Sequence, residues 1–307
     1  MNHYSPITIK SIFKEYGIKP KKYLGQNFVI NKSVIDNIVK TADLNANDTI
    51  IEIGPGLGAL TIELAKKTKK VIAIEKDAKI CEILQNILIK NKIDNVSIVN
   101  QDILRFSPFE KSLTDPACRQ AGEQKYKVVA NIPYYITQPI IRLFLEFAKP
   151  PESITLLVQK EVAQRICAIA PKMNLLAVSV QFYAQPEIIS YVSKNNFWPQ
   201  PKVDSAILKI SQIHPPNFLN NPLVKNGDIL QKVERVNFFK TVRAGFSSPR
   251  KMLIGNINKK LEIPRETILK IYRNIGIDPA IRAENLTIKK WQELSIAIFS
   301  HTTENMI

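Results

Sequence analysis

Short apolar segments alternate with amphipathic ones through the first two thirds of the chain. Apolar side chains at Val34, Ile35, Ile38 and Val39 recur at helical spacing and predict a helix over 32–41. Further helices are predicted over 59–67, 78–90, 139–147 and 160–170. Compact, mainly apolar runs predict strands over 49–53, 70–75, 96–99, 126–131, 154–159, 178–183 and 203–210. This alternation predicts an α/β fold with a mostly parallel sheet and right-handed crossover connections.

The pattern changes after residue 210. Residues 211–222 are rich in Pro and Asn, which favours a linker, and the segments beyond it have helical periodicity only. Those helices are predicted over 229–244, 249–258, 265–275 and 288–299. A chain of 307 residues suits two domains, which we place at 1–213 and 222–307. Residues 112–124 have no periodicity and are interpreted as a surface loop or insertion.

Composition excludes several classes of protein. With 45% hydrophobic and 23% charged residues, the chain is typical of a soluble globular protein. Its apolar runs are of strand length, far short of the roughly 20 residues of a membrane-spanning helix, and its start has no secretory pattern. The three cysteines (Cys81, Cys118 and Cys167) lack CxxC spacing, and only three histidines are present. We therefore expect a cytoplasmic protein with neither a disulfide framework nor a metal site.

Positive charge is concentrated at the two ends of the chain. The formal net charge is +16, with an excess of four in residues 1–30, four in residues 31–200 and eight in residues 201–307. This distribution favours a polyanionic partner, such as a nucleic acid, held around a less basic catalytic body. In residues 240–251 (KTVRAGFSSPRK), cations surround Phe246, and this stretch is a candidate contact with RNA phosphates.

A glycine-rich turn follows the first predicted strand of the sheet. The sequence GPGLG at 54–58 allows a ligand to lie against the backbone, and Glu75 ends the next strand, 21 residues after Gly54. A carboxylate there suits the two hydroxyls of a ribose. Asp102, after the third strand, suits an adenine amine, with Ile103 packing on the ring. The turn alone is compatible with NAD as well as with S-adenosylmethionine.

The fourth strand of the sheet leads into the tetrapeptide NIPY at residues 131–134. An adenine amino group is a poor nucleophile because its lone pair is delocalised, so its methylation requires positioning and hydrogen-bond acceptors. Asn131 offers a side-chain carbonyl and Ile132 a backbone carbonyl, which Pro133 holds in an extended conformation. Tyr134 offers a ring on which an extruded base can stack. The tetrapeptide thus predicts methyl transfer to an exocyclic amine, in DNA or RNA.

Taken together, these motifs resemble the RNA adenine dimethyltransferases typified by the small-subunit (16S) rRNA enzyme. The resemblance extends over nearly the whole chain, in KYLGQNF (22–28), EIGPGLG (52–58), NIPY (131–134), QKEV (159–162), FWPQPKVDSA (197–206) and GIDPAIRAEN (276–285). It implies a Rossmann-like methyltransferase sheet with an antiparallel strand at its edge and a small all-helical C-terminal domain. It also implies that an N-terminal segment, 1–31, covers the cofactor S-adenosylmethionine.

The resemblance also implies roles for individual residues. Cofactor contacts fall on Asn27, Val29, Gly54, Glu75, Asp102 and Asn131. Asn131 and Tyr134 are implied as the catalytic residues, the first touching both cofactor and base and the second stacking on the base. Phe197 is either a second stacking partner or a residue of a core-lining loop.

The implied reaction is dimethylation of the N6 groups of two adjacent adenosines near the 3′ end of small-subunit rRNA, by a monomer acting on the immature small ribosomal subunit. Three other functions remain open. A large-subunit rRNA methyltransferase shares the glycine turn and the tetrapeptide, but the resemblance at 276–285 disfavours it. An assembly factor in which binding matters more than methylation is a second, and an NAD-dependent oxidoreductase is a third.

Overall fold

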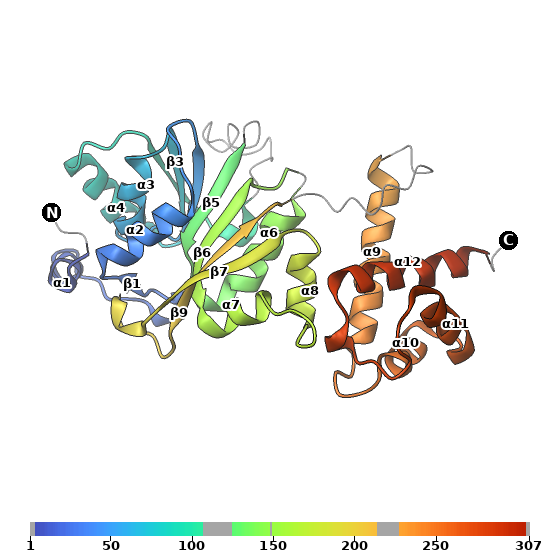
Figure 1. Ribbon diagram of the computed structural model, residues 1–307. Coiled ribbons are helices and arrows are strands. Elements are labelled where there is room, and N and C mark those ends of the chain that lie inside the picture. Colours follow the sequence, from blue (N-terminus) through green and yellow to red (C-terminus); the bar gives the residue numbers. More distant parts are fainter. Residues whose placement is uncertain (1–3, 107–124, 148, 214–226, 305–307) are drawn as a thin grey trace. The chain divides into compact units, whose positions relative to one another are not determined.

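The computed structural model describes residues 4–106, 125–147, 149–213 and 227–304, which form two compact units (Figure 1). The first unit comprises residues 1–163 and 185–213, and the second comprises residues 164–184 and 214–307. These units are sets of residues in mutual contact, and the domain boundaries 1–213 and 222–307 remain a prediction. The predicted insertion at 112–124 and most of the predicted linker at 211–222 lie outside the described residues.

The centre of the first unit is a seven-stranded sheet, counted over the described residues. Its strands are β2 (Thr49–Ile53), β3 (Lys70–Glu75), β4 (Val96–Asn100), β5 (Tyr126–Asn131), β6 (Ser153–Gln159), β7 (Gln185–Val192) and β9 (Ser205–Ser211). Their spatial order is β4-β3-β2-β5-β6-β9-β7, in which β9 is antiparallel to both of its neighbours and the other pairs are parallel. The predicted α/β fold with a mostly parallel sheet is confirmed.

Helices provide the apolar surfaces that bury this sheet. They include α2 (Lys32–Thr41), α3 (Ala59–Ala65), α4 (Ala78–Lys90), α6 (Thr137–Glu146) and α7 (Lys160–Ile166). One buried cluster joins apolar residues of α2 and α3 to Ile50, Val129 and Leu157 of the strands, and a second contains the apolar residues of α4. Because helices pack against the sheet, β2 is buried at all five positions, as parallel strands usually are.

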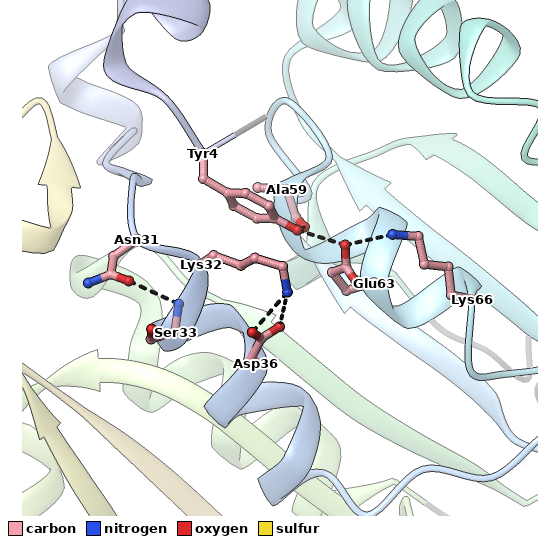
Figure 2. Close-up of polar contacts among 8 residues, drawn as sticks. All are labelled: Tyr4, Asn31, Lys32, Ser33, Asp36, Ala59, Glu63 and Lys66. Atoms are coloured by element: carbon pink, nitrogen blue, oxygen red, sulfur yellow. Dashed lines mark hydrogen bonds and ion pairs between the residues drawn. The ribbon is translucent and has the colours of Figure 1, made fainter. Parts of the chain in front are cut away.

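An N-terminal segment that periodicity did not predict packs onto this body. It contains α1 (Pro6–Glu15), the short 3₁₀ turn η1 (Lys22–Leu24) and β1 (Phe28–Val29), which pairs with β8 (Phe197–Trp198). Figure 2 shows how its start is held: the Tyr4 hydroxyl donates to Glu63 at 2.8 Å, and Lys66 binds the same carboxylate at 2.8 Å. Residues before the sheet are thereby fixed to α3.

The sequence prediction was wrong at residues 178–183, where we expected a strand. The structure has the helix α8 (Leu175–Gln181) there, and the next strand, β7, begins only at Gln185. Valines and aromatic residues made the segment resemble a strand. Instead, Asn174 caps a helix by accepting from the backbone N–H of Ala177 at 3.0 Å, and Val178 and Val180 are buried on it.

The described part of the second unit is helical throughout, in agreement with the predicted C-terminal fold. Its helices are α8, α9 (Gly227–Gly245), α10 (Leu253–Leu261), α11 (Arg265–Ile275) and α12 (Ile288–Glu304), with a short turn η5 (Ala283–Asn285). Aromatic side chains form its core: Phe182 stacks on Phe238 with ring centroids 4.2 Å apart, and Phe246 stacks on Trp291 at 5.4 Å. Across the described residues, no helix is both long and apolar enough to cross a membrane.

Gly58 offers a test of how tightly the glycine turn packs on α4. Its φ is +82°, and an added Cβ would lie 2.6 Å from Cδ1 of Leu84. Gly17 has φ +63° but nothing within 4 Å of the added atom. We expect Gly17→Ala to lower the free energy of unfolding by about 1 kcal/mol and Gly58→Ala by roughly 2–4 kcal/mol, measured by urea denaturation. Equal losses of unfolding free energy in the two variants would show that the Leu84 side chain moves aside without an energetic cost.

Candidate active site at the carboxyl edge of the sheet

A single pocket of the first unit brings together all the residues that the sequence assigned to the site. Its lining includes Asn27, Val29, Gly54, Glu75, Asp102, Asn131 and Tyr134. The strand register explains this convergence, because Ile53 of β2 pairs with both Ile74 of β3 and Ala130 of β5. Three parallel strands therefore end level with one another. The next residue of each strand lies at the same edge of the sheet, and these residues are Gly54, Glu75 and Asn131.

Phe197 lies elsewhere. It is 3% exposed, pairs with Val29 through its backbone, and belongs to the buried cluster that includes α2. Of the two interpretations that the sequence left open for Phe197, this position matches the core-lining one. The pocket residues described above do not include it.

The glycine turn presents backbone rather than side chains to the pocket. Gly54, Gly56 and Gly58 all have positive φ, and the Gly54 N–H donates to the carbonyl of Ile74 at 2.9 Å. An added Cβ at Gly56 would lie 3.0 Å from the ring of Phe28, which belongs to the N-terminal segment. The turn is thus enclosed by a ring that leaves no room for a side chain.

Glu75 ends β3 with its side chain almost buried, at 8% exposed. Its Oε1 accepts from the backbone N–H of Asp77 at 2.9 Å. Burial raises the pKa of the Glu75 carboxyl, although hydrogen bonds from the backbone N–H groups of Asp77 and Gly56 oppose that rise. The carboxyl is held in place by the backbone and faces the pocket, as a ribose-binding acceptor should be.

Asp102 has a more exposed environment at the next strand end. Its Oδ1 caps the short turn η2 (Ile103–Arg105) by accepting from Leu104 N–H at 3.0 Å, and its Oδ2 pairs with Lys76 at 2.9 Å. The hydrogen bond from Lys76 lowers the pKa of the Asp102 carboxyl, which stays ionised at neutral pH. Each carboxylate oxygen has more than one lone pair, so these bonds leave capacity for a ligand amine.

Asn131 is oriented by the N-terminal segment. Its Nδ2 donates to the backbone carbonyl of Asn27 at 3.0 Å, and the side chain of Asn27 donates in turn to the Gly25 carbonyl at 3.2 Å. Because the amide nitrogen of Asn131 is used in this way, its Oδ1 is the end of the amide that is left to accept from a substrate. This arrangement supplies what an adenine amine requires.

Tyr134 is fixed at both ends. Its hydroxyl forms a 2.7 Å hydrogen bond with Oγ of Ser205 on β9, and burial raises the pKa of that hydroxyl. Its backbone carbonyl accepts from the Thr137 side chain at 3.1 Å, at the start of α6. The ring therefore has a defined place on the pocket wall, next to Ile132 and Pro133.

Further contacts hold the N-terminal segment over the pocket. Lys21 Nζ pairs with Asp77 at 2.8 Å, and Gln26 joins them by donating to the same carboxylate at 3.3 Å while its own oxygen accepts from the Lys21 backbone at 2.8 Å. Asp77 is also the residue that donates its backbone N–H to Glu75. One small cluster thus connects the segment to Glu75.

Glu52 is a pocket residue that the sequence analysis did not identify. It lies in the buried strand β2, is 1% exposed, and lines the pocket, and its Oε2 has no hydrogen-bond partner among the described residues. Burial raises the pKa of its carboxyl to about 8. The available signal was an acidic residue in an otherwise apolar strand, TIIEI, directly before the glycine turn.

The pocket suits S-adenosylmethionine. That molecule carries hydroxyl and amine donors, and the lining offers acceptor oxygens on the side chains of Glu52, Glu75 and Asp102. The orphaned buried oxygen of Glu52 is a site where a donor from a ligand would replace a missing partner. The particular contact that each residue makes stays a prediction.

The pKa of Glu52 gives a measurable effect on stability. Between about pH 4.5 and pH 8 the folded protein holds a proton on Glu52 that the unfolded chain releases, so the free energy of unfolding should fall as pH rises through this range. In Glu52→Gln that fall should be smaller, measured by urea denaturation at pH 6 and pH 8.5. Glu75, whose pKa is also raised, should leave a residual slope.

Glu63→Gln is the control for this experiment. Although partial burial opposes it, hydrogen bonds from Lys66 and Tyr4 lower the pKa of Glu63, so this carboxylate is ionised throughout the range. Its replacement should leave the pH slope unchanged. A Glu52→Gln slope equal to that of the original protein would contradict the assignment of the proton to Glu52.

Known proteins resemble this chain over most of its length. Residues 17–299 match the family described as ribosomal RNA adenine dimethylase. The ribosomal RNA small subunit methyltransferase A of Dehalococcoides mccartyi (strain CBDB1) is 41% identical over 288 residues, which cover 94% of this chain and 91% of that protein. The protein of the same name from Bacillus pumilus (strain SAFR-032) is 38% identical over 299 residues, 95% of each chain.

Solved structures agree in fold. A dimethyladenosine transferase from Plasmodium falciparum aligns with a TM-score of 0.72 at 22% identity, over 89% of this chain and 98% of that one. The 23S rRNA methyltransferase ErmE aligns with a TM-score of 0.66 at 24% identity, over 89% of this chain and 99% of that one. The predicted methyltransferase fold, enzymatic activity and cofactor are confirmed. This chain belongs to the ribosomal RNA adenine dimethylase family, and it is an S-adenosylmethionine-dependent methyltransferase.

Proposed function

We propose that this protein dimethylates the N6 amino groups of two adjacent adenosines near the 3′ end of 16S rRNA, during biogenesis of the small ribosomal subunit. The observation that carries the proposal is the hydrogen bond from Asn131 Nδ2 to the Asn27 carbonyl. It leaves Oδ1 of Asn131 as an acceptor at the end of β5, beside the acid-lined part of the pocket.

The protein's own groups act by positioning. S-adenosylmethionine supplies an electrophilic methyl group bonded to a sulfonium. Asn131 Oδ1 accepts a hydrogen bond from the adenine amine and so favours electron density on its nitrogen, and the backbone carbonyl of Ile132 provides a second acceptor. Among the described residues nothing donates to that carbonyl. As the N–CH3 bond forms, the S–CH3 bond breaks and S-adenosylhomocysteine leaves with the electron pair. The methylated nitrogen is positively charged, so its proton is acidic and passes to water, and no side chain of shifted pKa is needed as a base.

Tyr134 holds the base. Its ring is fixed by the hydroxyl bond to Ser205, so a stacked adenine would be immobilised without a further cost in side-chain freedom. Stacking on a ring is indifferent to whether the amine already carries one methyl group. The same site therefore serves for the first and second transfers to one adenosine.

The choice of substrate rests on the relatives. Proteins named ribosomal RNA small subunit methyltransferase A are 38–41% identical to this chain over more than nine tenths of its length. The basic excess of residues 201–307 suits a large RNA. We place the protein in the cytoplasm, where ribosomal subunits assemble, and propose that it acts as a monomer on the immature subunit.

The proposal is tested by incubating the protein with radiolabelled S-adenosylmethionine and small ribosomal subunits that lack this modification. We expect N6-dimethyladenosine at two adjacent positions near the 3′ end of the RNA, located by primer extension. Preferential labelling of large-subunit RNA would favour the alternative substrate. Binding of subunits without methyl transfer, despite cofactor binding, would favour a role as an assembly factor.

Asn131→Ala should separate chemistry from binding. Loss of the positioning acceptor should lower kcat by roughly 100- to 1000-fold, comparable to removal of a transition-state hydrogen bond in other enzymes. The affinity for S-adenosylhomocysteine, measured by calorimetry, should fall by no more than about tenfold, because one hydrogen bond contributes about 0.5–1.5 kcal/mol. A variant that retains most of its kcat would refute the role given to Oδ1.

A further inference from the structure

Beyond Tyr134, the carboxyl edge of the sheet continues across three more strands to a pair that the proposed chemistry does not use. Lys160 is the first residue after β6, and its backbone N–H donates to the carbonyl of Asp204 at 3.0 Å. Tyr191 lies near the end of β7. The ammonium of Lys160 sits over the ring of Tyr191, 4.9 Å from its centroid. Both residues belong to the first unit.

Tyr191 is the exposed member of this pair, and Lys160 is partly buried. Tyr191 is 54% exposed, whereas its neighbour Val192 is 5% exposed and Ser205, on the adjacent strand β9, is fully buried. No carboxylate of the described residues forms an ion pair with Lys160. A cation–π contact at an exposed site contributes only about 0.5–1 kcal/mol.

The strand register places the pair close to the base-binding wall. The Tyr134 hydroxyl is bonded to Ser205, whose partners in the sheet are Gln159 on β6 and Val192 on β7. Lys160 and Tyr191 are the chain neighbours of those two partners. Because side chains alternate between the two faces of a strand, Tyr191 projects from the face opposite to that of Val192 and Ser205, so the pair lies across this edge of the sheet from the Tyr134 hydroxyl. Figure 1 shows β6, β9 and β7 running side by side.

We propose that Lys160 and Tyr191 bind a single-stranded nucleotide that flanks the target adenosine, with the Tyr191 ring stacking on its base and the Lys160 ammonium contacting its phosphate. Aromatic rings beside cations are the means by which proteins bind single-stranded RNA without hydrogen bonding to base edges. The inference rests on the proposed function, because it assumes that the base stacked on Tyr134 belongs to an RNA strand. It assigns to β7 and to the residue that follows β6 the task of holding that strand while one adenosine occupies the pocket.

Equilibrium binding of RNA tests the proposed roles of Lys160 and Tyr191 separately from catalysis. The probe is a short fluorescein-labelled single-stranded RNA with two central adenosines, and the dissociation constant is measured by anisotropy at several salt concentrations. Tyr191→Ala should weaken binding by roughly 5- to 160-fold, as expected for loss of one stacked base at about 1–3 kcal/mol. Tyr191→Phe should stay within about twofold of the original protein. Lys160→Met should reduce the slope of log affinity against log salt by about 0.7.

Two control variants match these changes. Ile189→Ala removes an apolar side chain from the same strand, 38% exposed, without removing a ring. Lys125→Met removes an exposed charge just before β5, at the opposite edge of the sheet. Both should bind the RNA probe as the original protein does. All variants should bind S-adenosylhomocysteine equally, because neither Lys160 nor Tyr191 lines the cofactor pocket as the described residues define it.

Turnover on small ribosomal subunits completes the test. Tyr191→Ala should raise KM for the subunit with kcat little changed, since the target base still stacks on Tyr134. The inference is overturned if Tyr191→Ala binds the probe like the original protein, or if Ile189→Ala weakens binding equally. Absence of methyl transfer by the original protein would instead refute the proposed function. The comparison of RNA binding between the variants would then still decide whether Lys160 and Tyr191 bind a nucleotide.

Discussion

The hydrogen bond between the Asn131 side chain and the Asn27 backbone is the constraint on which the site depends. The Asn131 amide, at the end of β5, carries an NH2 group that donates and an oxygen that accepts, and only the oxygen can accept a hydrogen bond from an adenine amine. The bond uses the nitrogen and thereby selects the oxygen as the acceptor. Its second partner belongs to a segment that is held at separate points, by Tyr4 on Glu63, by Lys21 on Asp77 and by the pairing of β1 with β8. The N-terminal segment thus determines the chemistry of a strand that follows it by about a hundred residues.

Charge is divided between the interior of the pocket and the rest of the chain. The acids at the edge are buried or half-buried, with Glu52 at 1% and Glu75 at 8% exposed, although the whole protein has a formal charge of +16. Of these acids Asp102 has a lowered pKa and is ionised at neutral pH, which favours a cationic ligand, whereas burial raises the pKa of Glu52 and of Glu75; the basic excess of the chain favours a polyanion. The two substrates of the proposed reaction have these opposite charges.

Sequence patterns predicted the parallel sheet well because buried strands and amphipathic helices have different periods. They also placed Gly54, Glu75 and Asn131 at one edge, since parallel strands end together. They failed at α8, where β-forming side chains hid a helix that Asn174 caps. The bond between Asn27 and Asn131 was beyond prediction, because it joins a backbone carbonyl to a side chain 104 positions away and depends on packing. Glu52 was overlooked because strand periodicity does not show whether a carboxyl buried in the strand has a hydrogen-bond partner.

The strand order explains how one edge accommodates two ligands. β5, which carries Asn131, lies between β2 and β6. On the side of β2, β3 and β4 the parallel strands end in the glycine turn, Glu75 and Asp102, the groups suited to a nucleotide cofactor. On the other side the direction reverses at β9, so a strand start, Ser205, meets the strand ends of β6 and β7 at the same edge. That reversal brings a hydroxyl to Tyr134 and sets Lys160 beside Tyr191. The Asn131 amide, the proposed acceptor for the target amine, is central because it ends the strand that borders both halves.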